Sequence, residues 1–449
     1  MSEITSTPSA PPTPLRSVQR GEGSSWLDKW FQTCADLAAL KASHPMLDAV
    51  IERIDGRRIS VGGHWLTDFA SCNYLGLDLD RDVISAIPAY LDEWGTHPSW
   101  SRLLGSPTLY EQIEQKVTQL TGADDVLALP TITHIHMSVL PILAGGGTVF
   151  LDGRAHKTIY DGSLIAASHG AAIQRFRHND HEHLEELLRS SAATPRVVCM
   201  DGVNSMTGNA PDIAEFARLA RSYDALLYVD DAHGFGVIGE RSENELCDYG
   251  TRGNGIVRYF NEGYDNIVLV AGFSKAYSSL LAFVACPTDL KDVLKVAAPP
   301  YLYSGPSPVA SLASTLAGLE VNERRGDQIR LDLHRKTQRV LDFLRDADVA
   351  TPNQLGTPII EVPLRHHEDI HEVGELLFKR GIYVTLAAYP LVPKAEVGFR
   401  IQVTAANTDE EITHLIDVLT EVGERFRLRT PEEAARTSVG ISEQPPSPR

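Results

Sequence analysis

A regular alternation of short apolar runs with helical patterns restricts the fold of this chain more than any other feature. The run RVVCM (196–200) is followed by DIAEFARLARSY (212–223), whose apolar residues recur at helical spacing, and then by ALLYV (225–229). A further run, NIVLVAG (266–272), continues this order. Such alternation is typical of a mostly parallel sheet with helices on both faces, which binds its ligand beyond the carboxyl ends of the strands. The sequence therefore predicts an α/β fold.

The character of the sequence changes near residue 301, and both ends differ from the middle. Long charged helical stretches, such as 330–346, precede shorter apolar runs there, which predicts a smaller α+β domain. The two ends are rich in Ser, Thr and Pro, as disordered tails are. The predicted division is a tail over 1–23, an N-terminal arm over 24–65, a large domain over 66–300, a C-terminal α+β domain over 301–429 and a tail over 430–449.

Composition argues against several classes of function. A formal net charge of −18 disfavours sequence-independent binding to nucleic acid and binding to anionic membranes. The five cysteines form no C-x-x-C pair, so neither a disulfide framework nor a zinc knuckle is indicated. No secretory signal and no run of membrane-spanning length is found, so we expect a cytoplasmic protein without a membrane span.

Two polar residues stand at the ends of apolar runs, Asp230 in VDDAHGFGVIG (229–239) and Lys275 in GFSKA (272–276). An aspartate in such a place often only caps a helix. A lysine among small, weakly polar residues is costly to bury, however, and a Schiff base would remove that cost. A Schiff base with pyridoxal phosphate needs a carboxylate at the pyridine nitrogen. Asp230 and Lys275 match these two roles, and His233 lies near enough to hydrogen-bond the ring hydroxyl.

With these residues the chain resembles the α-oxoamine synthases, which are pyridoxal-phosphate enzymes of fold type I, the aminotransferase class I/II fold. The resemblance runs from about residue 45 to residue 425, and several ordered motifs are far more specific than one. It implies a large domain with a mostly parallel sheet between helices and a smaller α+β C-terminal domain. The motifs are ASCNYLGL (70–77), SRLLGSPTLYEQIE (101–114), DGRAHKTIYDGS (152–163), RFRHND (175–180), DGVNSM (201–206), VDDAHGFGVIG, GFSKA and FRIQVTAANT (399–408).

The resemblance implies a role for each matched residue around the cofactor. Lys275 would carry pyridoxal phosphate as a Schiff base, and Asp230 would pair with the pyridine nitrogen. His156 would stack on the ring, while Ser205 and His233 would contact the ring hydroxyl.

The resemblance also implies the reaction and the assembly. A small amino acid, its carboxylate held by Arg400 with Asn73 nearby, would condense with an acyl thioester, usually with decarboxylation, to give an α-amino ketone. The acyl donor would be a coenzyme A thioester or an acyl carrier protein. Members of the family share their active sites across a dimer interface, so we expect a homodimer.

The sequence departs from the family where the cofactor phosphate is held. The family uses a Ser-Gly-aromatic turn at a helix start, and the aligned residues here are Thr131, Ile132 and Thr133. Backbone N–H groups of Ile132 and Thr133, the flanking hydroxyls and the helix dipole remain available to a phosphate. Ile132, however, replaces a glycine that lets the backbone approach closely.

Two further phosphate contacts of the family are altered. Its threonine three residues before the lysine is Gly272 here, and the threonine that the other subunit usually supplies is Gly305. The hydroxyls of Ser274 and Ser304 remain as possible donors. We therefore expect a weakened phosphate site, which a Gly272→Thr substitution would strengthen.

Three alternatives stay open. His134 and His136, in PTITHIHMSV (130–139), would both face one side of a strand and suit a metal, but the family resemblance puts this segment at a helix start and we expect no metal site. Another fold type I reaction, transamination or decarboxylation, would use the same Asp230 and Lys275. A non-catalytic subunit that partners an active paralogue would explain the altered phosphate residues.

Overall fold

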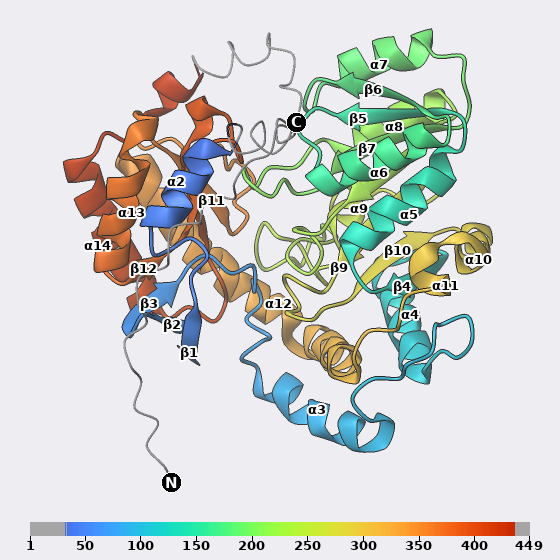
Figure 1. The fold of residues 1–449 in the computed structure, drawn as a ribbon, viewed down its shortest axis with the longest axis horizontal. Coiled ribbons are helices and arrows are strands. Elements are labelled where there is room, and N and C mark those ends of the chain that lie inside the picture. The colour runs from blue at the N-terminus through green and yellow to red at the C-terminus, as the bar shows by residue number, and fades with distance from the viewer. Residues whose placement is uncertain (1–31, 33, 436–449) are drawn as a thin grey trace, which may run out of the picture.

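The centre of the molecule is a seven-stranded sheet, seen edge-on among its helices in Figure 1. The computed structural model describes residue 32 and residues 34–435. In spatial order the strands are β4 (Asp125–Leu129), β10 (Ala282–Cys286), β9 (Ile267–Gly272), β8 (Leu226–Asp230), β7 (Arg196–Asp201), β5 (Thr148–Asp152) and β6 (Ala172–Phe176). Only β10 runs antiparallel to its neighbours, so the predicted α/β fold with a mostly parallel sheet is confirmed.

Helices cover both faces of this sheet, so its inner strands are buried on both sides, whereas the edge strand β6 is partly exposed. Successive residues of a strand point to opposite faces, and in β8 Leu227 and Val229 join one apolar cluster while Tyr228 joins the other. The helices on the Tyr228 side are α5 (Ile132–Ala144), α6 (Lys157–Ser168), α10 (Thr288–Ala297) and α11 (Pro299–Leu302). On the other side lie α4 (Thr108–Thr121), α7 (His181–Ser190), α8 (Ile213–Ser222) and the short α9 (Ile256–Tyr259).

Two smaller sheets lie beside the large one. Strands β1 (Ile51–Asp55), β2 (Arg58–Val61) and β3 (His64–Asp68) form an antiparallel ribbon, and β12 (Ile382–Tyr383) pairs in parallel with β3. The N-terminal arm is thereby joined to the C-terminal part of the chain. The third sheet is antiparallel, in the order β11 (Ile359–Pro363), β14 (Gly398–Gln402), β13 (Thr385–Ala387). Helices α2 (Ala35–Ser43), α13 (Ile370–Lys379) and α14 (Asp409–Arg425) accompany these sheets in Figure 1.

One long helix, α12 (Val309–Asp346), connects the two parts of the molecule, and no proline interrupts it. It extends the helix predicted over 330–346 by more than five turns towards the N-terminus. Near its middle Arg330 is completely buried, and its Nη1 donates to the carbonyl oxygen of Gly236 at 3.1 Å. Helix α3 (Arg81–Trp94) contacts α12 as well, through an ion pair of 2.7 Å between Arg325 and Asp80.

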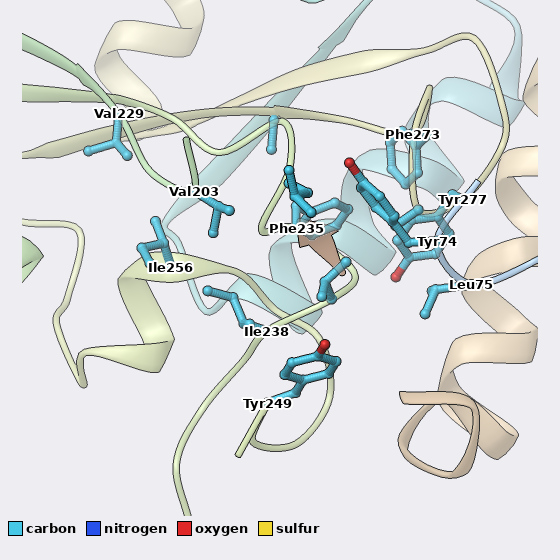
Figure 2. Packing of buried hydrophobic residues seen from close by; sticks show 14 of the residues in the cluster. Tyr74, Leu75, Val203, Val229, Phe235, Ile238, Tyr249, Ile256, Phe273 and Tyr277 are labelled. Carbon is cyan, nitrogen blue, oxygen red and sulfur yellow. The ribbon is translucent and has the colours of Figure 1, made fainter. Parts of the chain in front are cut away.

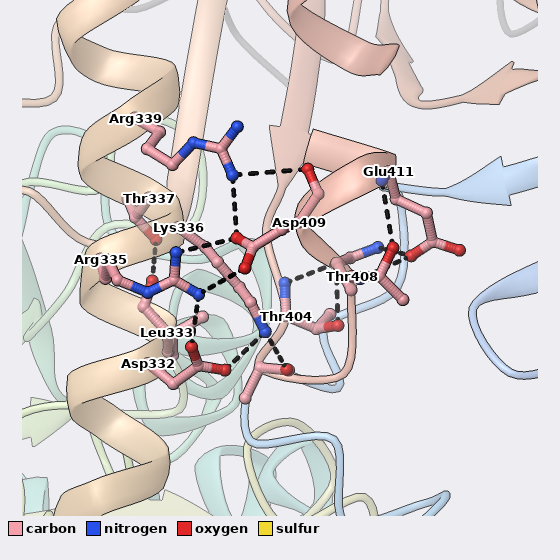
Figure 3. A network of polar contacts seen from close by, with 12 residues as sticks. Asp332, Leu333, Arg335, Lys336, Thr337, Arg339, Thr404, Thr408, Asp409 and Glu411 are labelled. Atoms are coloured by element: carbon pink, nitrogen blue, oxygen red, sulfur yellow. Dashed lines mark hydrogen bonds and ion pairs between the residues drawn. The ribbon is translucent and has the colours of Figure 1, made fainter. Parts of the chain in front are cut away.

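The second half of α12 is held to the C-terminal region by a polar network (Figure 3). Arg335 and Arg339 each donate to Oδ1 of Asp409 at 2.8 Å. Lys336 donates to the carbonyl oxygen of Ala405 at 2.6 Å. Asp409 opens α14 directly after Thr408, whose side chain forms a capping box with Glu411. The network therefore fixes the start of α14 against α12.

The ends of the chain differ in part from the sequence prediction. The tail expected over 1–23 lies outside the described residues. The tail expected over 430–449 begins instead with a helical turn at 431–435, because Thr430 and Glu433 cap each other. Among the described residues, no helix combines the length and apolar character needed to cross a membrane. The division of the chain into domains stays a prediction.

Candidate active site

A cavity of about 270 Å³ opens at the carboxyl ends of β7 and β8, beside the first turns of α5 and α6. This is where an open parallel sheet is expected to bind a ligand. Eight of the eleven residues predicted from the sequence line it: Ile132, Thr133, His156, Ser205, Asp230, His233, Ser274 and Lys275. The rest of the lining is Thr131, Thr158, Asp201, Val203, Ala232 and Leu280.

Asp230 is the last residue of β8, and hydrogen bonds hold its carboxylate in place. Oδ1 accepts from the backbone N–H of Ala232 at 3.0 Å, and Oδ2 lies 2.9 Å from Nε2 of His136. Burial alone would raise the pKa of Asp230, but His136, which hydrogen-bonds to it, and then Lys275 lower it below the ordinary value. Asp230 is therefore ionised at neutral pH.

A second carboxyl group, Asp201, ends the neighbouring strand and pairs in register with Asp230. Its Oδ1 accepts from the backbone N–H of His156 at 2.9 Å. Burial and then the charge of Asp230 raise the pKa of Asp201 well above its ordinary value. Asp201 therefore binds a proton more readily than Asp230 does. Asp201 was not predicted as a site residue, although it stands at a strand end just as Asp230 does.

His233 follows Asp230 in the loop after β8, and a tyrosine sets the orientation of its ring. The hydroxyl of Tyr74 lies 2.8 Å from Nδ1 of His233, and 3.2 Å from Oε1 of Gln402. Burial, followed by the charges of Lys275 and Arg400, lowers the pKa of His233 well below its ordinary value. His233 is therefore a neutral imidazole whose Nδ1 is already engaged, which leaves Nε2 for a ligand.

Aromatic packing fixes the loop that carries His233 (Figure 2). Phe235 stacks on Tyr277 with ring centroids 5.4 Å apart, and meets Phe273 edge-on at 5.7 Å. Gly236 adopts a φ of +88°, where a side chain would be strained and would also strike Ala276. The GFG of the motif therefore builds the turn, while His233 provides the polar group.

Lys275 lies three residues beyond the end of β9 and is half-buried. Within the described part of the chain no hydrogen bond or ion pair holds its amine. His156 caps the start of α6, with Nδ1 2.8 Å from the hydroxyl of Thr158. The cavity thus holds an amine without a partner and a histidine ring fixed at a helix start.

The first turn of α5 closes one end of the cavity. Thr131 caps this helix by accepting from the backbone N–H of His134 at 3.3 Å. The side chain of Ile132 lies against Gly272: a Cβ atom on Gly272 would sit 3.0 Å from Cδ1 of Ile132 and 3.1 Å from the carbonyl oxygen of Leu281. The two departures from the family are therefore complementary in space. The expectation that Gly272→Thr alone would strengthen the site overlooks this contact.

Three predicted residues lie outside the cavity lining. Arg400, on β14, donates from Nη1 to the carbonyl oxygen of Ser205 at 2.5 Å, while its buried Nε has no partner among the residues that the structure describes. The amide of Asn73 donates to Asp78 at 3.0 Å, and the half-buried Ser304 donates to the carbonyl oxygen of Gly305 at 3.1 Å. The roles expected of these residues stay predictions.

The pair of histidines that suggested a metal lies on a helix, as the family resemblance implied, and its two members are separated. His134 is exposed, whereas His136 is completely buried against Asp230. In the described ranges no group of three or more His, Cys, Asp or Glu side chains is placed to hold a metal ion. Sequence reasoning missed His136 as a site residue, and its only signal was a histidine on the apolar side of a helix.

Comparisons with known proteins agree with this geometry. Residues 66–419 match the family "Aminotransferase class I and II". The 8-amino-7-oxononanoate synthase of Dechloromonas aromatica is 31% identical over 378 residues, which cover 83% of this chain and 94% of the relative. That of Pelobacter propionicus is 32% identical over 382 residues, with 83% and 93% covered.

Solved structures show the same fold. The serine palmitoyltransferase of Sphingomonas wittichii superposes with a TM-score of 0.81 at 24% identity, covering 90% of this chain and 99% of the other. The chain therefore belongs to the α-oxoamine synthases, the pyridoxal-phosphate-dependent C-acyltransferases of the aminotransferase class I and II family.

Proposed function

We propose that this protein binds pyridoxal phosphate and condenses a small amino acid with an acyl thioester. The thiol leaves, the carboxyl group is usually lost as CO₂, and an α-amino ketone is released. The observation that carries this proposal is the gathering of Lys275, Asp230, His233 and His156 around one cavity at the strand ends. We further propose a cytoplasmic homodimer, as its family membership suggests.

The residues present fit the cofactor. The amine of Lys275, which has no partner among the described residues, is free to bond covalently to the aldehyde carbon, and the ionised Asp230 matches a protonated pyridine nitrogen. The N–H groups of Ile132 and Thr133 are available to the phosphate. When bound, pyridoxal phosphate withdraws electrons from the α-carbon of an attached amino acid.

The protein's own groups then have distinct tasks. The carboxylate of Asp230 would keep a proton at the ring nitrogen, and the amine of Lys275 would remove the α-proton of the substrate. His233 would hydrogen-bond the ring hydroxyl through Nε2, since Tyr74 occupies Nδ1. His156, which lines the cavity, would cover the ring and exclude water from it.

Arg400 is proposed to bind the substrate carboxylate. Its buried Nε lacks a partner in the described part of the chain, and its Nη1 contacts the carbonyl oxygen of Ser205, a residue that lines the cavity. A guanidinium matches a carboxylate with two parallel hydrogen bonds. The length of the acyl chain, and the choice between coenzyme A and a carrier protein, are to be identified by comparing acyl thioesters in the activity assay.

The test begins with the cofactor. The purified protein is incubated with pyridoxal phosphate, reduced with borohydride and digested, and the peptide carrying the pyridoxyl group is identified by mass spectrometry. We expect the group on Lys275, no labelling at the active site in Lys275→Ala, and normal labelling in Lys379→Ala, which changes an exposed lysine on α13.

Protein that has not been reduced with borohydride is then assayed with glycine, alanine or serine and a series of acyl thioesters, and the release of free thiol is measured. Thiol release that depends on the amino acid supports the proposal. An adduct on Lys275 with conversion of the amino acid but no thiol release would favour transamination or decarboxylation. Absence of any adduct would favour the non-catalytic subunit.

A further inference from the structure

A buried histidine that the proposed reaction does not use lies directly behind the carboxylate of Asp230. His136 is 0% exposed and lies one turn into α5. Its Nε2 is 2.9 Å from Oδ2 of Asp230, and its Nδ1 is 2.8 Å from the hydroxyl of Tyr228. Both ring nitrogens therefore have a partner in the protein, and neither faces a ligand.

The fold explains why these three side chains meet. Tyr228 and Asp230 are two residues apart on β8, so both point to the same face of the sheet. Helix α5 covers that face, and the His136 ring meets the Tyr228 ring edge-on, with centroids 5.6 Å apart. The three residues form a row from the middle of the strand to its carboxyl end.

Hydrogen-bonding capacity sets the direction of the protons in this row. Tyr228 is completely buried, and burial raises its pKa well above the ordinary value, so its hydroxyl keeps its proton. The carboxylate of Asp230 can only accept, so Nε2 of His136 carries a hydrogen and donates to it. The Tyr228 hydroxyl engages the remaining ring nitrogen, Nδ1.

We propose that His136, oriented by Tyr228, is a positioning residue that holds the carboxylate of Asp230 ready for the cofactor ring. The inference rests on the proposed function, because the partner of Asp230 is the pyridine nitrogen. His136 also distinguishes the two adjacent carboxyl groups: it donates to Asp230, whereas Asp201 receives, from the described residues, the backbone N–H of His156 alone. In this way the negative charge stays on the carboxylate that the cofactor needs.

The test compares two ligands that differ at one atom. Apo protein is titrated with pyridoxal phosphate and with its deaza analogue, in which C–H replaces the ring nitrogen. Four variants are compared with the parent protein: His136→Leu, His136→Gln, Tyr228→Phe and His134→Gln. The last changes the exposed histidine of the same helix and serves as the matched control.

We expect His136→Leu to weaken binding of pyridoxal phosphate roughly 10- to 100-fold, the effect of losing a hydrogen bond to a charged group. Binding of the analogue changes less than about threefold, because Asp230 has no nitrogen to pair with in that ligand. His136→Gln, which keeps a side-chain N–H, recovers most of the affinity. Tyr228→Phe falls between these two variants, and His134→Gln matches the parent.

The ratio of the two affinities separates a specific role from a structural one. Equal losses for both ligands, or no loss in His136→Leu, would overturn the inference while leaving the proposed function intact. A parent protein that binds neither ligand would instead overturn the proposed function, and this inference with it. If His136→Leu does not fold, the near-isosteric His136→Gln and Tyr228→Phe variants give the same comparison, and an unchanged ratio in Tyr228→Phe counts against the proposal.

Discussion

The contact between Ile132 and Gly272 decides whether a side chain at position 272 raises or lowers the free energy of unfolding. Gly272 has no positive φ, so its backbone conformation accepts alanine. Replacing a glycine at such a site ordinarily stabilises a protein by about 0.4–1 kcal/mol, because the unfolded chain loses freedom. Here the new Cβ would lie 3.0 Å from Cδ1 of Ile132 and 3.1 Å from the carbonyl oxygen of Leu281.

The magnitude follows from which of these atoms can move. The Leu281 carbonyl accepts a hydrogen bond from Phe273 at 2.8 Å and is held in place, whereas Cδ1 of Ile132 ends a flexible side chain. Overpacking of this kind costs about 1–3 kcal/mol, which outweighs the gain from the unfolded chain. We expect Gly272→Ala to lower the free energy of unfolding by about 1–2 kcal/mol, and Gly272→Thr to lower it more.

The assay is a double-mutant cycle by urea unfolding of the apo protein, with Gly272→Ala, Ile132→Ala and the double variant. Ile132→Ala removes one of the two close contacts and leaves the Leu281 carbonyl in place, so the cost of Gly272→Ala in that background should fall by about 1 kcal/mol without vanishing. If the two changes are additive within about 0.5 kcal/mol, the contact with Ile132 contributes nothing and this part of the steric argument is wrong. A stabilising Gly272→Ala in the otherwise unchanged protein would refute it as well.

Three further predictions concern other parts of the molecule. Burial, and then Glu396, raise the pKa of Glu361 from 4.5 to about 7. Between these pH values the folded state binds more protons than the unfolded state, so the free energy of unfolding falls as pH rises. Glu361→Gln should flatten this fall, by at most about 1.4 kcal/mol per pH unit, as measured by urea unfolding at several pH values. Arg102 is buried and donates to Glu114 at 3.0 Å, so Arg102→Leu should cost about 3 kcal/mol of unfolding free energy, a loss that Arg102→Lys restores only in part. Tyr74→Phe removes the hydroxyl that orients His233 and should lower kcat roughly tenfold with a smaller change in KM; equal changes in both would contradict this role.

Features that depend on local periodicity were predictable from the sequence. The runs around 196–200, 225–229 and 266–272 are strands, and 212–223 contains a helix, because burial on one or both faces leaves a repeat of two or 3.6 residues. Asp230 and Lys275 were recognisable for a related reason. Each follows an apolar strand, and the carboxyl ends of such strands form the ligand edge of the sheet.

Features that depend on contacts between distant segments were not predictable in this way. The pairing of Asp201 with Asp230 follows from the register of β7 and β8, which neither segment specifies alone. His136 reaches Asp230 only because α5 presents that residue to β8, and the pattern His-x-His is equally compatible with other structures. The space beside Gly272 is filled by Ile132, a residue from another helix, so the two departures from the family looked independent in the sequence.

The unbroken α12 connects the loop that carries His233 to the C-terminal part of the molecule. At 1.5 Å per residue its 38 residues extend about 57 Å, and its two ends belong to different parts of the molecule. Near the middle of this helix, the side chain of Arg330 binds the carbonyl oxygen of Gly236, three residues past His233. Asp409, the first residue of α14, is bound by Arg335 and Arg339 in the second half of the same helix. The start of α14 and the His233 loop are therefore attached to one continuous stretch of helix, with no break between the two points of attachment.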